Sequence, residues 1–402
     1  MTDAHSHFRL CRRTVPLAAA VFALGLTGCG EKSGGPKVSV PAPVPAGGDL
    51  TPGWPMTRGG GGLTGKVAGP APRVPAVEWT FANGSPITSE AAVGEGLIVF
   101  GDEDGSINAV ETASRKRRWR AKTDDTVEAA PAIIGGKVFA GSNDGVFRAL
   151  DTRTGEAAWS AEGGEKFPTG AVLTERDGGP VLLVNGYDGI ARCLRPADGK
   201  ELWRHETGDY VNGSPVLLDG GWTAFGGCDA KLHILRVADG TAEGSLKSDA
   251  QIIRTMAGWG ETLYGVNYAN QLFAAAREGE RPAWIYETED TQFLTPPAAD
   301  EKRVYAGCRD KCLHAVDRLT GKPVWKFRTG GRVSGAPLVF DDAVVFGSAD
   351  GRLYAVAKED GAEIWKLELG EKIELPPAFA GGRLIVGGGE GTLFVVRGGG
   401  SP

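Results

Sequence analysis

Residues 141–159 read GSNDGVFRALDTRTGEAAW, and residues 307–325 read GCRDKCLHAVDRLTGKPVW. Both are copies of one unit that recurs at intervals of 40 to 44 residues and ends at a tryptophan. The tryptophans that keep this period are Trp79, Trp119, Trp159, Trp203, Trp284, Trp325 and Trp365, and Gly244 stands where one more would fall. A unit of about 40 residues is too small to bury its own apolar face, so neighbouring copies must pack on each other.

Each unit shows the alternation of apolar and polar residues that is typical of β-strands. In the copy that ends at Trp365, short apolar segments at 336–340, 343–346 and 353–356 precede the strand that carries the tryptophan. Tight Asp-Gly turns, which favour hairpins, separate such segments at Asp104-Gly105, Asp144-Gly145, Asp188-Gly189 and Asp350-Gly351. Four antiparallel strands per unit, repeated around an axis, predict an all-β fold, the β-propeller.

The two ends of the repeat predict how the ring closes. Residues 77–81 form an outer-type strand with no inner strands before it, whereas the last unit supplies three inner strands between residues 377 and 396 and no outer strand. The N-terminal strand therefore completes the last blade, which removes two exposed sheet edges. We expect an eight-bladed propeller over residues 77–397, with four-stranded antiparallel blades.

The turn into the fourth strand carries a specific signature. The pattern A-x-D-x-x-T-G-x-x-x-W is complete in two copies, at Ala149, Asp151, Thr154, Gly155 and Trp159 and again at Ala315, Asp317, Thr320, Gly321 and Trp325. This pattern resembles the repeat of the pyrroloquinoline-quinone (PQQ) propeller superfamily. A tryptophan buries about 150–250 Å², so we interpret the periodic tryptophans as structural residues that fill the gaps between blades.

The N-terminus predicts a signal peptide over residues 1–28. Three arginines precede an apolar run at 15–26, which is too short to cross a bilayer and typical of a signal-peptide core. The following Leu26-Thr27-Gly28-Cys29 resembles a bacterial lipobox. That resemblance implies that Cys29 becomes the lipid-modified first residue of the mature protein. Gly30, rather than Asp, follows the cysteine, which by the same analogy implies anchoring at the periplasmic face of the outer membrane.

Two short regions separate Cys29 from the repeats. Residues 29–53 are rich in proline and glycine, a composition that predicts a solvated tether. Residues 54–76 begin Trp-Pro-Met-Thr-Arg-Gly-Gly, which resembles the short lead-in segment found before such propellers.

Composition and cysteine content narrow the function classes. The formal net charge is −6, which disfavours a general role in nucleic-acid binding. The repeats contain four cysteines, Cys193, Cys228, Cys308 and Cys312. Cys308 and Cys312 flank a short turn, so a disulfide between them is plausible in an oxidising periplasm. Four cysteines allow three complete pairings, and the sequence does not choose among them.

Metal and haem sites are not expected. Cys308-x3-Cys312-x-His314 has the residue types of a haem or zinc site, but its spacing differs from the C-x-x-C-H of a c-type haem site. The alternative is a zinc site formed by Cys308, Cys312 and His314 together with Cys228 or His233. His233 and His314 occupy the strand position that Tyr354 fills in the seventh blade, so we interpret both as ordinary strand residues.

The superfamily resemblance leaves two main functions to compare. PQQ-dependent dehydrogenases carry a vicinal Cys-Cys pair and long insertions between blades, and this sequence has neither. PQQ is also a tricarboxylate that needs several convergent basic groups, so PQQ is not expected as a cofactor. The compact blades and the lipobox resemble the BamB-like lipoproteins, which are scaffolds in outer-membrane protein assembly. That resemblance implies a non-catalytic monomer that binds a membrane or periplasmic protein. A quinoprotein dehydrogenase and a periplasmic small-ligand or glycan-binding module remain the alternatives.

A docking surface is expected where the connections between consecutive blades gather around the central channel. Equivalent positions in these connections carry polar, basic and aromatic side chains on an otherwise acidic protein. Because Tyr and Arg are frequent interface anchors, the predicted partner-binding residues are Lys166, Tyr210, Arg254, Arg332 and Lys372.

Overall fold

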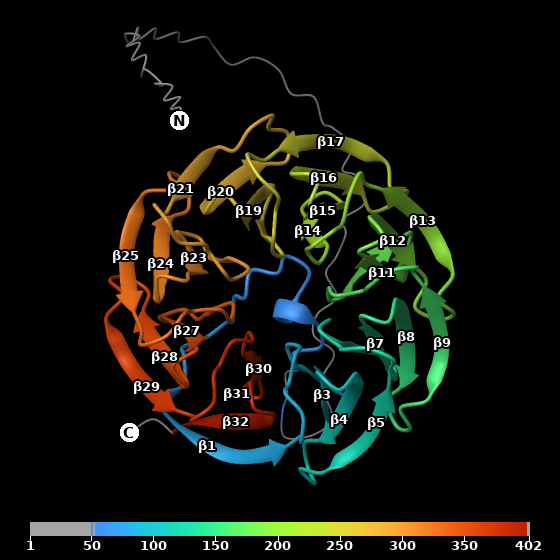
Figure 1. The fold of residues 1–402 in the computed structure, drawn as a ribbon, viewed down its shortest axis with the longest axis horizontal. Helices are drawn as coiled ribbons and strands as arrows, with labels where there is room; N and C mark the ends of the chain where they lie inside the picture. The colour runs from blue at the N-terminus through green and yellow to red at the C-terminus, as the bar shows by residue number, and fades with distance from the viewer. Residues whose placement is uncertain (1–49, 51–52, 400–402) are drawn as a thin grey trace, which may run out of the picture. The chain divides into compact units, whose positions relative to one another are not determined.

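The computed structural model describes residue 50 and residues 53–399, so that Cys29, the signal peptide and the tether up to residue 49 lie outside the described residues. The described part folds into eight four-stranded antiparallel sheets arranged as the blades of one propeller (Figure 1). The predicted all-β, eight-bladed architecture is thereby confirmed. No helix among the described residues has the length and apolar character needed to cross a membrane.

The blades follow each other in chain order, each with its innermost strand first. The first four are β2 (Ala92–Gly94), β3 (Leu97–Asp102), β4 (Ser106–Glu111) and β5 (Arg117–Lys122); β6 (Ala132–Ile134), β7 (Lys137–Gly141), β8 (Val146–Asp151) and β9 (Ala157–Glu162); β10 (Val172–Arg176), β11 (Gly179–Asn185), β12 (Ile190–Leu194) and β13 (Glu201–Glu206); and β14 (Val216–Leu218), β15 (Trp222–Gly226), β16 (Lys231–Arg236) and β17 (Ala242–Lys247).

Blades 5 to 8 repeat the same order. They are β18 (Ala257–Trp259), β19 (Thr262–Val266), β20 (Gln271–Ala276) and β21 (Trp284–Glu287); β22 (Ala298–Ala299), β23 (Arg303–Gly307), β24 (Cys312–Asp317) and β25 (Pro323–Arg328); β26 (Leu338–Val339), β27 (Ala343–Ser348), β28 (Arg352–Ala357) and β29 (Glu363–Glu368); and β30 (Ala378–Ala380), β31 (Arg383–Gly387) and β32 (Thr392–Gly399) with β1 (Arg73–Ala82).

The ring closes as the two ends of the repeat predict. Strand β1 pairs antiparallel with β32, with Trp79 opposite Val395, and so supplies the outer strand of blade 8. The strand begins at Arg73 rather than at the predicted residue 77, because it bulges twice and continues to pair as far as Gly399. Every blade is therefore a complete four-stranded sheet.

Six of the seven periodic tryptophans hydrogen-bond across the interfaces between blades. The indole Nε1 of Trp119 donates to the carbonyl of Thr152 in blade 2 at 2.9 Å, and that of Trp325 donates to Lys358 in blade 7 at 2.8 Å. The same bond to the next blade is made by Trp159, Trp203, Trp284 and Trp365. Because an indole offers one polar group on a large apolar ring, each of these six tryptophans buries area and also sets the register between two blades.

The turn glycine of the repeat is explained by the same contact. Gly321 has a φ of +68°, and a Cβ at this position would lie 2.6 Å from the Trp284 ring of the preceding blade. Gly155 has the equivalent relation to Trp119, with a φ of +74° and 2.7 Å to the ring. Only glycine accepts both the positive φ and the close approach of an aromatic face, which is why Thr-Gly and Trp recur together.

The interface between blades 4 and 5 lacks this contact. No atom lies within 4 Å of where a side chain at Gly244 would begin. A groove of about 1140 Å³ opens there, and its lining includes Lys247, Arg277, Arg281 and Ile285. The tryptophan that the repeat lacks at Gly244 therefore corresponds to a blade interface without the tryptophan contact.

Residues 54–67, here called the inner strap, cross the centre of the ring (blue in Figure 1). The strap includes the short 3-10 helix η1 (Thr57–Gly59) and lies along the innermost strands of successive blades. Its carbonyls and amides bond to Val93, Ile133, Leu217, Gly258, Ala299 and Val339 in blades 1, 2, 4, 5, 6 and 7. The strap thus satisfies backbone groups on the free inner edges of these sheets, which would otherwise lack partners.

Candidate docking face at the channel mouth

The central channel is a small polar pocket of about 250 Å³. Each blade contributes to its wall from the connection that leads to its innermost strand, and the lining includes Thr88, Glu128, Pro168, Asn212, Arg254, Leu294, Ser334 and Glu374. Thr57 of the inner strap also lines the pocket. The strap therefore narrows the channel beneath the blade connections, and the accessible mouth lies on the side of those connections.

A buried carboxylate holds the strap in the channel. Glu90 accepts hydrogen bonds from the Trp54 indole at 2.8 Å, the Thr57 hydroxyl at 3.0 Å and the Arg58 amide at 2.9 Å. Burial raises the pKa of Glu90, and the hydrogen bonds from Trp54 and the backbone of Arg58 oppose that rise. Three donors from one short segment converge on this carboxylate, so Glu90 acts as the anchor point of the strap.

Arg58 of the strap also bonds to the opposite side of the ring. Its guanidinium donates to the carbonyl oxygens of Pro296 at 3.3 Å and Pro297 at 3.1 Å, which precede blade 6. Burial lowers the pKa of Arg58 to about 10, and the charge of Glu90 opposes this. Arg58 and Glu90 are thus a buried pair of opposite charge that connects blade 1 to blade 6 through the strap.

The five predicted partner-binding residues all lie exposed in the connections between blades. Arg254 lines the channel pocket itself. Arg332 donates to Glu374 of the next connection at 2.6 Å, so its charge is partly matched within the face. Lys166, Tyr210 and Lys372 complete the set. Their role in binding stays a prediction.

The structure adds an aromatic cluster that the sequence pattern did not indicate. Tyr187, in the hairpin turn after β11, stacks on Tyr210 with ring centroids 5.2 Å apart. Burial raises the pKa of the Tyr187 hydroxyl, and the nearby Cys228 and Glu128 act in the same direction. Tyr268, in the hairpin turn after β19, is 59% exposed. Hairpin turns and blade connections therefore meet at this face, whereas the residues predicted from the sequence lie in the connections alone.

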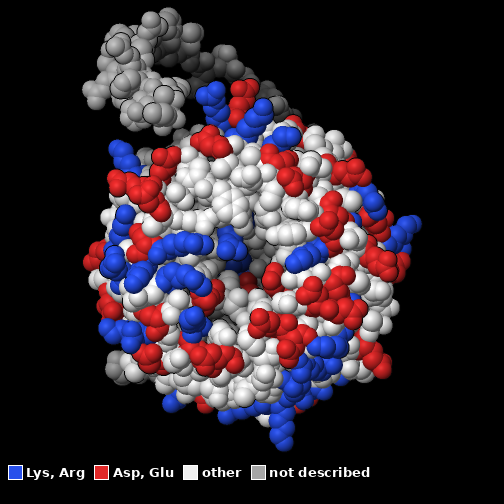
Figure 2. Space-filling model, viewed as in Figure 1, with Lys and Arg blue, Asp and Glu red and all other residues white. Residues whose placement is uncertain are grey.

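Charges of both signs surround the central hollow of the propeller face that Figure 2 shows. Lysine and arginine side chains gather mainly on the left of the hollow in this view and aspartate and glutamate below and to its right, so that no single-sign field covers the whole face. Such a surface favours directional pairing with a complementary protein surface over unspecific binding of a polyanion.

The predicted Cys308–Cys312 disulfide is not formed in the structure. All four described cysteines are free thiols. The Cys308 thiol points to the Gln292 carbonyl at 3.2 Å, whereas the Cys312 thiol contacts the Asp310 carbonyl at 3.6 Å. The two sulfurs thus have separate polar partners on either side of the turn, although their backbones are hydrogen-bonded neighbours.

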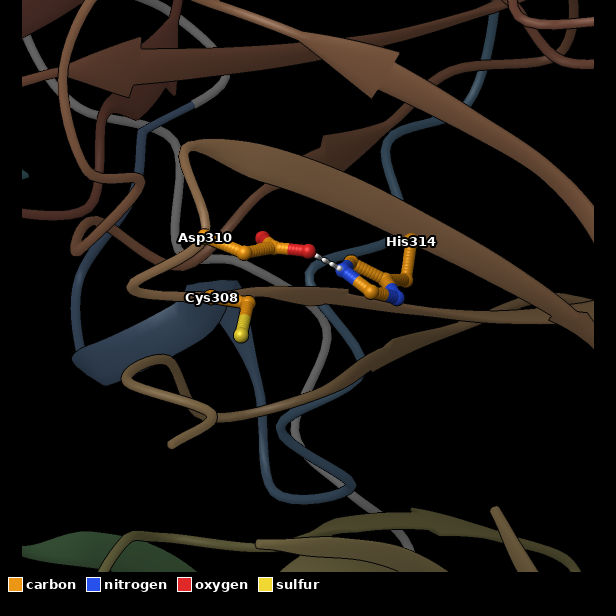
Figure 3. Close-up of side chains that lie close together, drawn as sticks. All are labelled: Cys308, Asp310 and His314. Carbon is orange, nitrogen blue, oxygen red and sulfur yellow. Dashed lines mark hydrogen bonds and ion pairs between the residues drawn. The ribbon is translucent and has the colours of Figure 1, made fainter. Parts of the chain in front are cut away.

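Blade 6 also brings together a cluster that contains two residues of the zinc alternative weighed from the sequence, Cys308 and His314. Cys308, Asp310 and His314 place one sulfur, one carboxylate oxygen and one imidazole nitrogen within 4.8 Å of one another (Figure 3). The third member, Asp310, lies in the short turn between the two cysteines and was not among the residues of that alternative. Its distance from His314 becomes short because the hairpin between β23 and β24 folds it back over that ring.

Comparisons with known proteins identify the relatives of this chain. A family model described as outer membrane protein assembly factor BamB matches residues 65–286 and 288–400. The outer membrane protein assembly factor BamB of Xanthomonas campestris pv. campestris is 32% identical over 256 residues, which are 63% of this chain and 55% of the relative. The match therefore spans little more than half of that relative's length.

Two solved structures share the fold. The crystal structure of BamB from Moraxella catarrhalis superposes with a TM-score of 0.67 at 18% identity, over 81% of this chain and 100% of that one. Quinohemoprotein alcohol dehydrogenase from Comamonas testosteroni superposes with a TM-score of 0.67 at 14% identity, over 88% of this chain and 81% of that one. Identities this low show the common fold alone. The family match instead covers nearly every residue of the propeller and confirms the resemblance seen in its repeats: this chain belongs to the family of the outer membrane protein assembly factor BamB.

Proposed function

We propose that this protein is a non-catalytic scaffold in outer-membrane protein assembly, which binds a protein partner through the channel-mouth face. The observation that carries the proposal is the match of the whole propeller to the BamB family. The face itself offers Tyr210 at 45% exposure, stacked on Tyr187, beside Arg254 and Arg332. Exposed tyrosine and arginine on a rigid support are typical anchors of protein interfaces, because they bury much area at little conformational cost.

The fold neighbour that is an alcohol dehydrogenase makes a quinoprotein the alternative, and the channel does not suit that cofactor. PQQ carries three carboxylates, whereas the pocket presents Glu90, Glu128 and Glu374 against Arg254 as its one basic group among the described lining residues. Its volume of about 250 Å³ is also below the ~300–1,000 Å³ of usual small-molecule sites. These features support a binding scaffold rather than a redox enzyme.

The docking proposal predicts a loss of binding without a loss of fold. The combined variant Lys166→Ala, Tyr210→Ala, Arg254→Ala and Arg332→Ala should abolish co-purification of the membrane partner. Its unfolding midpoint should change little, because the side chains are exposed and the Arg332–Glu374 pair on the surface contributes only ~0–1 kcal/mol.

The measurement is crosslinking in the native cell envelope followed by mass spectrometry of wild type and variant. A control variant, Arg153→Ala with Lys302→Ala, removes two exposed cations from turns at the other ends of the strands. Recovery of barrel-assembly proteins with wild type and the control, but not with the combined variant, supports the proposal. Equal recovery from all three proteins would overturn the choice of face, and the absence of any protein partner would favour the small-ligand module.

The family membership and the lipobox also support anchoring at the periplasmic face of the outer membrane through Cys29. Replacing Cys29→Ala should move the protein from the membrane fraction to the soluble periplasm, because the acyl chains would be lost. Cys11→Ala, which removes a cysteine from the signal peptide instead, should leave the partition unchanged. Intact mass spectrometry of the mature protein checks the lipid directly, and membrane retention of the Cys29→Ala variant would refute the anchor.

A further inference from the structure

The hairpin of blade 6 differs from its counterparts in one respect. In four other blades an aspartate of this turn bonds to the side chain four residues later: Asp144 to Arg148, Asp188 to Arg192, Asp229 to His233 and Asp350 to Tyr354. Blade 6 has the same arrangement, with Asp310 Oδ2 2.9 Å from His314 Nε2. The bond between Asp310 and His314 is therefore a structural feature of the repeat and does not by itself indicate a metal site.

A third group makes blade 6 unlike the others. The position two residues before the aspartate is Ser142, Gly186, Gly227 or Ser348 in those four blades, and it is Cys308 in blade 6. Within residues 50 and 53–399, Cys308, Asp310 and His314 are the one cluster of three such donors close enough to share a metal ion. From these three residues the geometry points to a binding site for a divalent transition metal of the zinc type.

The donor set suits such an ion. Sulfur, imidazole nitrogen and carboxylate oxygen are the ligand atoms of zinc, at ~2.0–2.3 Å from the metal. Donor atoms that lie within 4.8 Å of one another can surround an ion after small side-chain rotations. Three protein ligands leave the fourth tetrahedral position for water. The Asp310 side chain is 24% exposed, which gives an ion from solvent a path to His314 and Cys308.

Neighbouring groups hold these ligands in place. The Tyr286 hydroxyl lies 3.0 Å from His314 Nδ1, and the other oxygen of Asp310 accepts the Cys312 amide at 2.9 Å. A metal-binding histidine usually has its second nitrogen fixed by such a partner. Tyrosine can donate or accept, so the imidazole proton can move from Nε2 to Nδ1 when the ion arrives. The Cys308 thiol then releases its proton to solvent, and one proton leaves per ion bound.

Cobalt(II) added to the purified full-length mature protein tests the site, because thiolate coordination produces a charge-transfer band that neither carboxylate nor imidazole gives. We expect one cobalt per chain, displaced by zinc, in a reducing buffer. Cys308→Ser should abolish the band, and His314→Tyr should weaken binding at least tenfold. Tyr286→Phe, which removes the partner of the ring, should weaken it about 10- to 100-fold. Serine already stands at the Cys308 position in blades 2 and 7, and tyrosine at the His314 position in blade 7, so the variants should fold.

Two matched variants complete the experiment. Cys312→Ser removes the other thiol of the turn, and His233→Tyr alters the equivalent Asp–His pair of blade 4. Both should keep the band and the affinity of wild type. Absence of the band in folded wild-type protein, or its persistence in Cys308→Ser, would overturn the site. An unchanged unfolding midpoint for each variant distinguishes a lost ligand from a lost fold.

Discussion

Replacing Gly321 with valine is expected to lower the free energy of unfolding by about 3 kcal/mol or more. Two costs add up at this position. Its φ of +68° is unfavourable for a branched side chain, and the new Cβ would lie 2.6 Å from the Trp284 ring. The indole would have to leave the interface between blades 5 and 6, together with its 2.9 Å hydrogen bond to Arg318.

Urea unfolding measures this loss, and a second glycine separates its two causes. Gly164 has a similar φ of +77°, but no atom lies within 4 Å of a Cβ placed there. Gly164→Val should therefore cost only the backbone strain, ~1–2 kcal/mol. Equal losses for the two variants would show that the tryptophan contact adds nothing to stability.

Replacing Glu90 with alanine should destabilise the protein by about 3–5 kcal/mol, because the buried Arg58 amide loses its acceptor and its guanidinium loses the nearby opposite charge. Arg58 is 4% exposed, and the indole of Trp54 and the hydroxyl of Thr57 would also lose their acceptor. The strap should then detach from the inner strands. Limited proteolysis of residues 54–67, together with urea unfolding, measures both effects.

The variant Glu90→Gln is the matched control, because it keeps an acceptor oxygen and the side-chain shape. It should destabilise the protein less than Glu90→Ala and leave the strap resistant to protease. Burial raises the pKa of Glu90, so its contribution favours the folded state at low pH and is lost as the pH rises through the raised pKa. That decline should disappear in Glu90→Gln. Identical protease sensitivity of both variants and wild type would exclude Glu90 as the anchor.

The architecture could be predicted from the sequence because each repeat contains the turn residues and the apolar pattern that specify its own strands. Asp144-Gly145 specifies a hairpin turn by itself. The spacing of about 40 residues between successive tryptophans, such as Trp159, indicates the number of blades. The unpaired outer strand at residues 77–81 indicated ring closure, which the pairing of β1 with β32 confirms. These signals are short-range or periodic, so they can be recognised in the sequence without information on which segments are in contact in the folded protein.

The candidate sites were only partly accessible. Tyr210 was found because the repeat places it at an equivalent position in the blade connections. Arg254 was predicted in the first strand of blade 5, but it lies in the connection before β18, because that strand begins only at Ala257. Tyr187 was missed because it lies in a hairpin turn of the preceding blade and meets Tyr210 only across the blade interface. The Cys308–Cys312 pair shows a second limit, since their neighbouring positions across a turn leave the two sulfurs with separate polar partners in the structure.

The sequence by itself thus determined the blade, the number of blades and the order in which they close, since turn chemistry and hydrophobic period act over a few residues. Only the tertiary structure decided how Glu90 holds the inner strap in the channel and how Cys308, Asp310 and His314 converge. It also decided that the absent tryptophan at Gly244 leaves an open groove. The physical reason is that these arrangements depend on which segments the closed ring brings into contact, and a non-periodic contact leaves no pattern in the sequence.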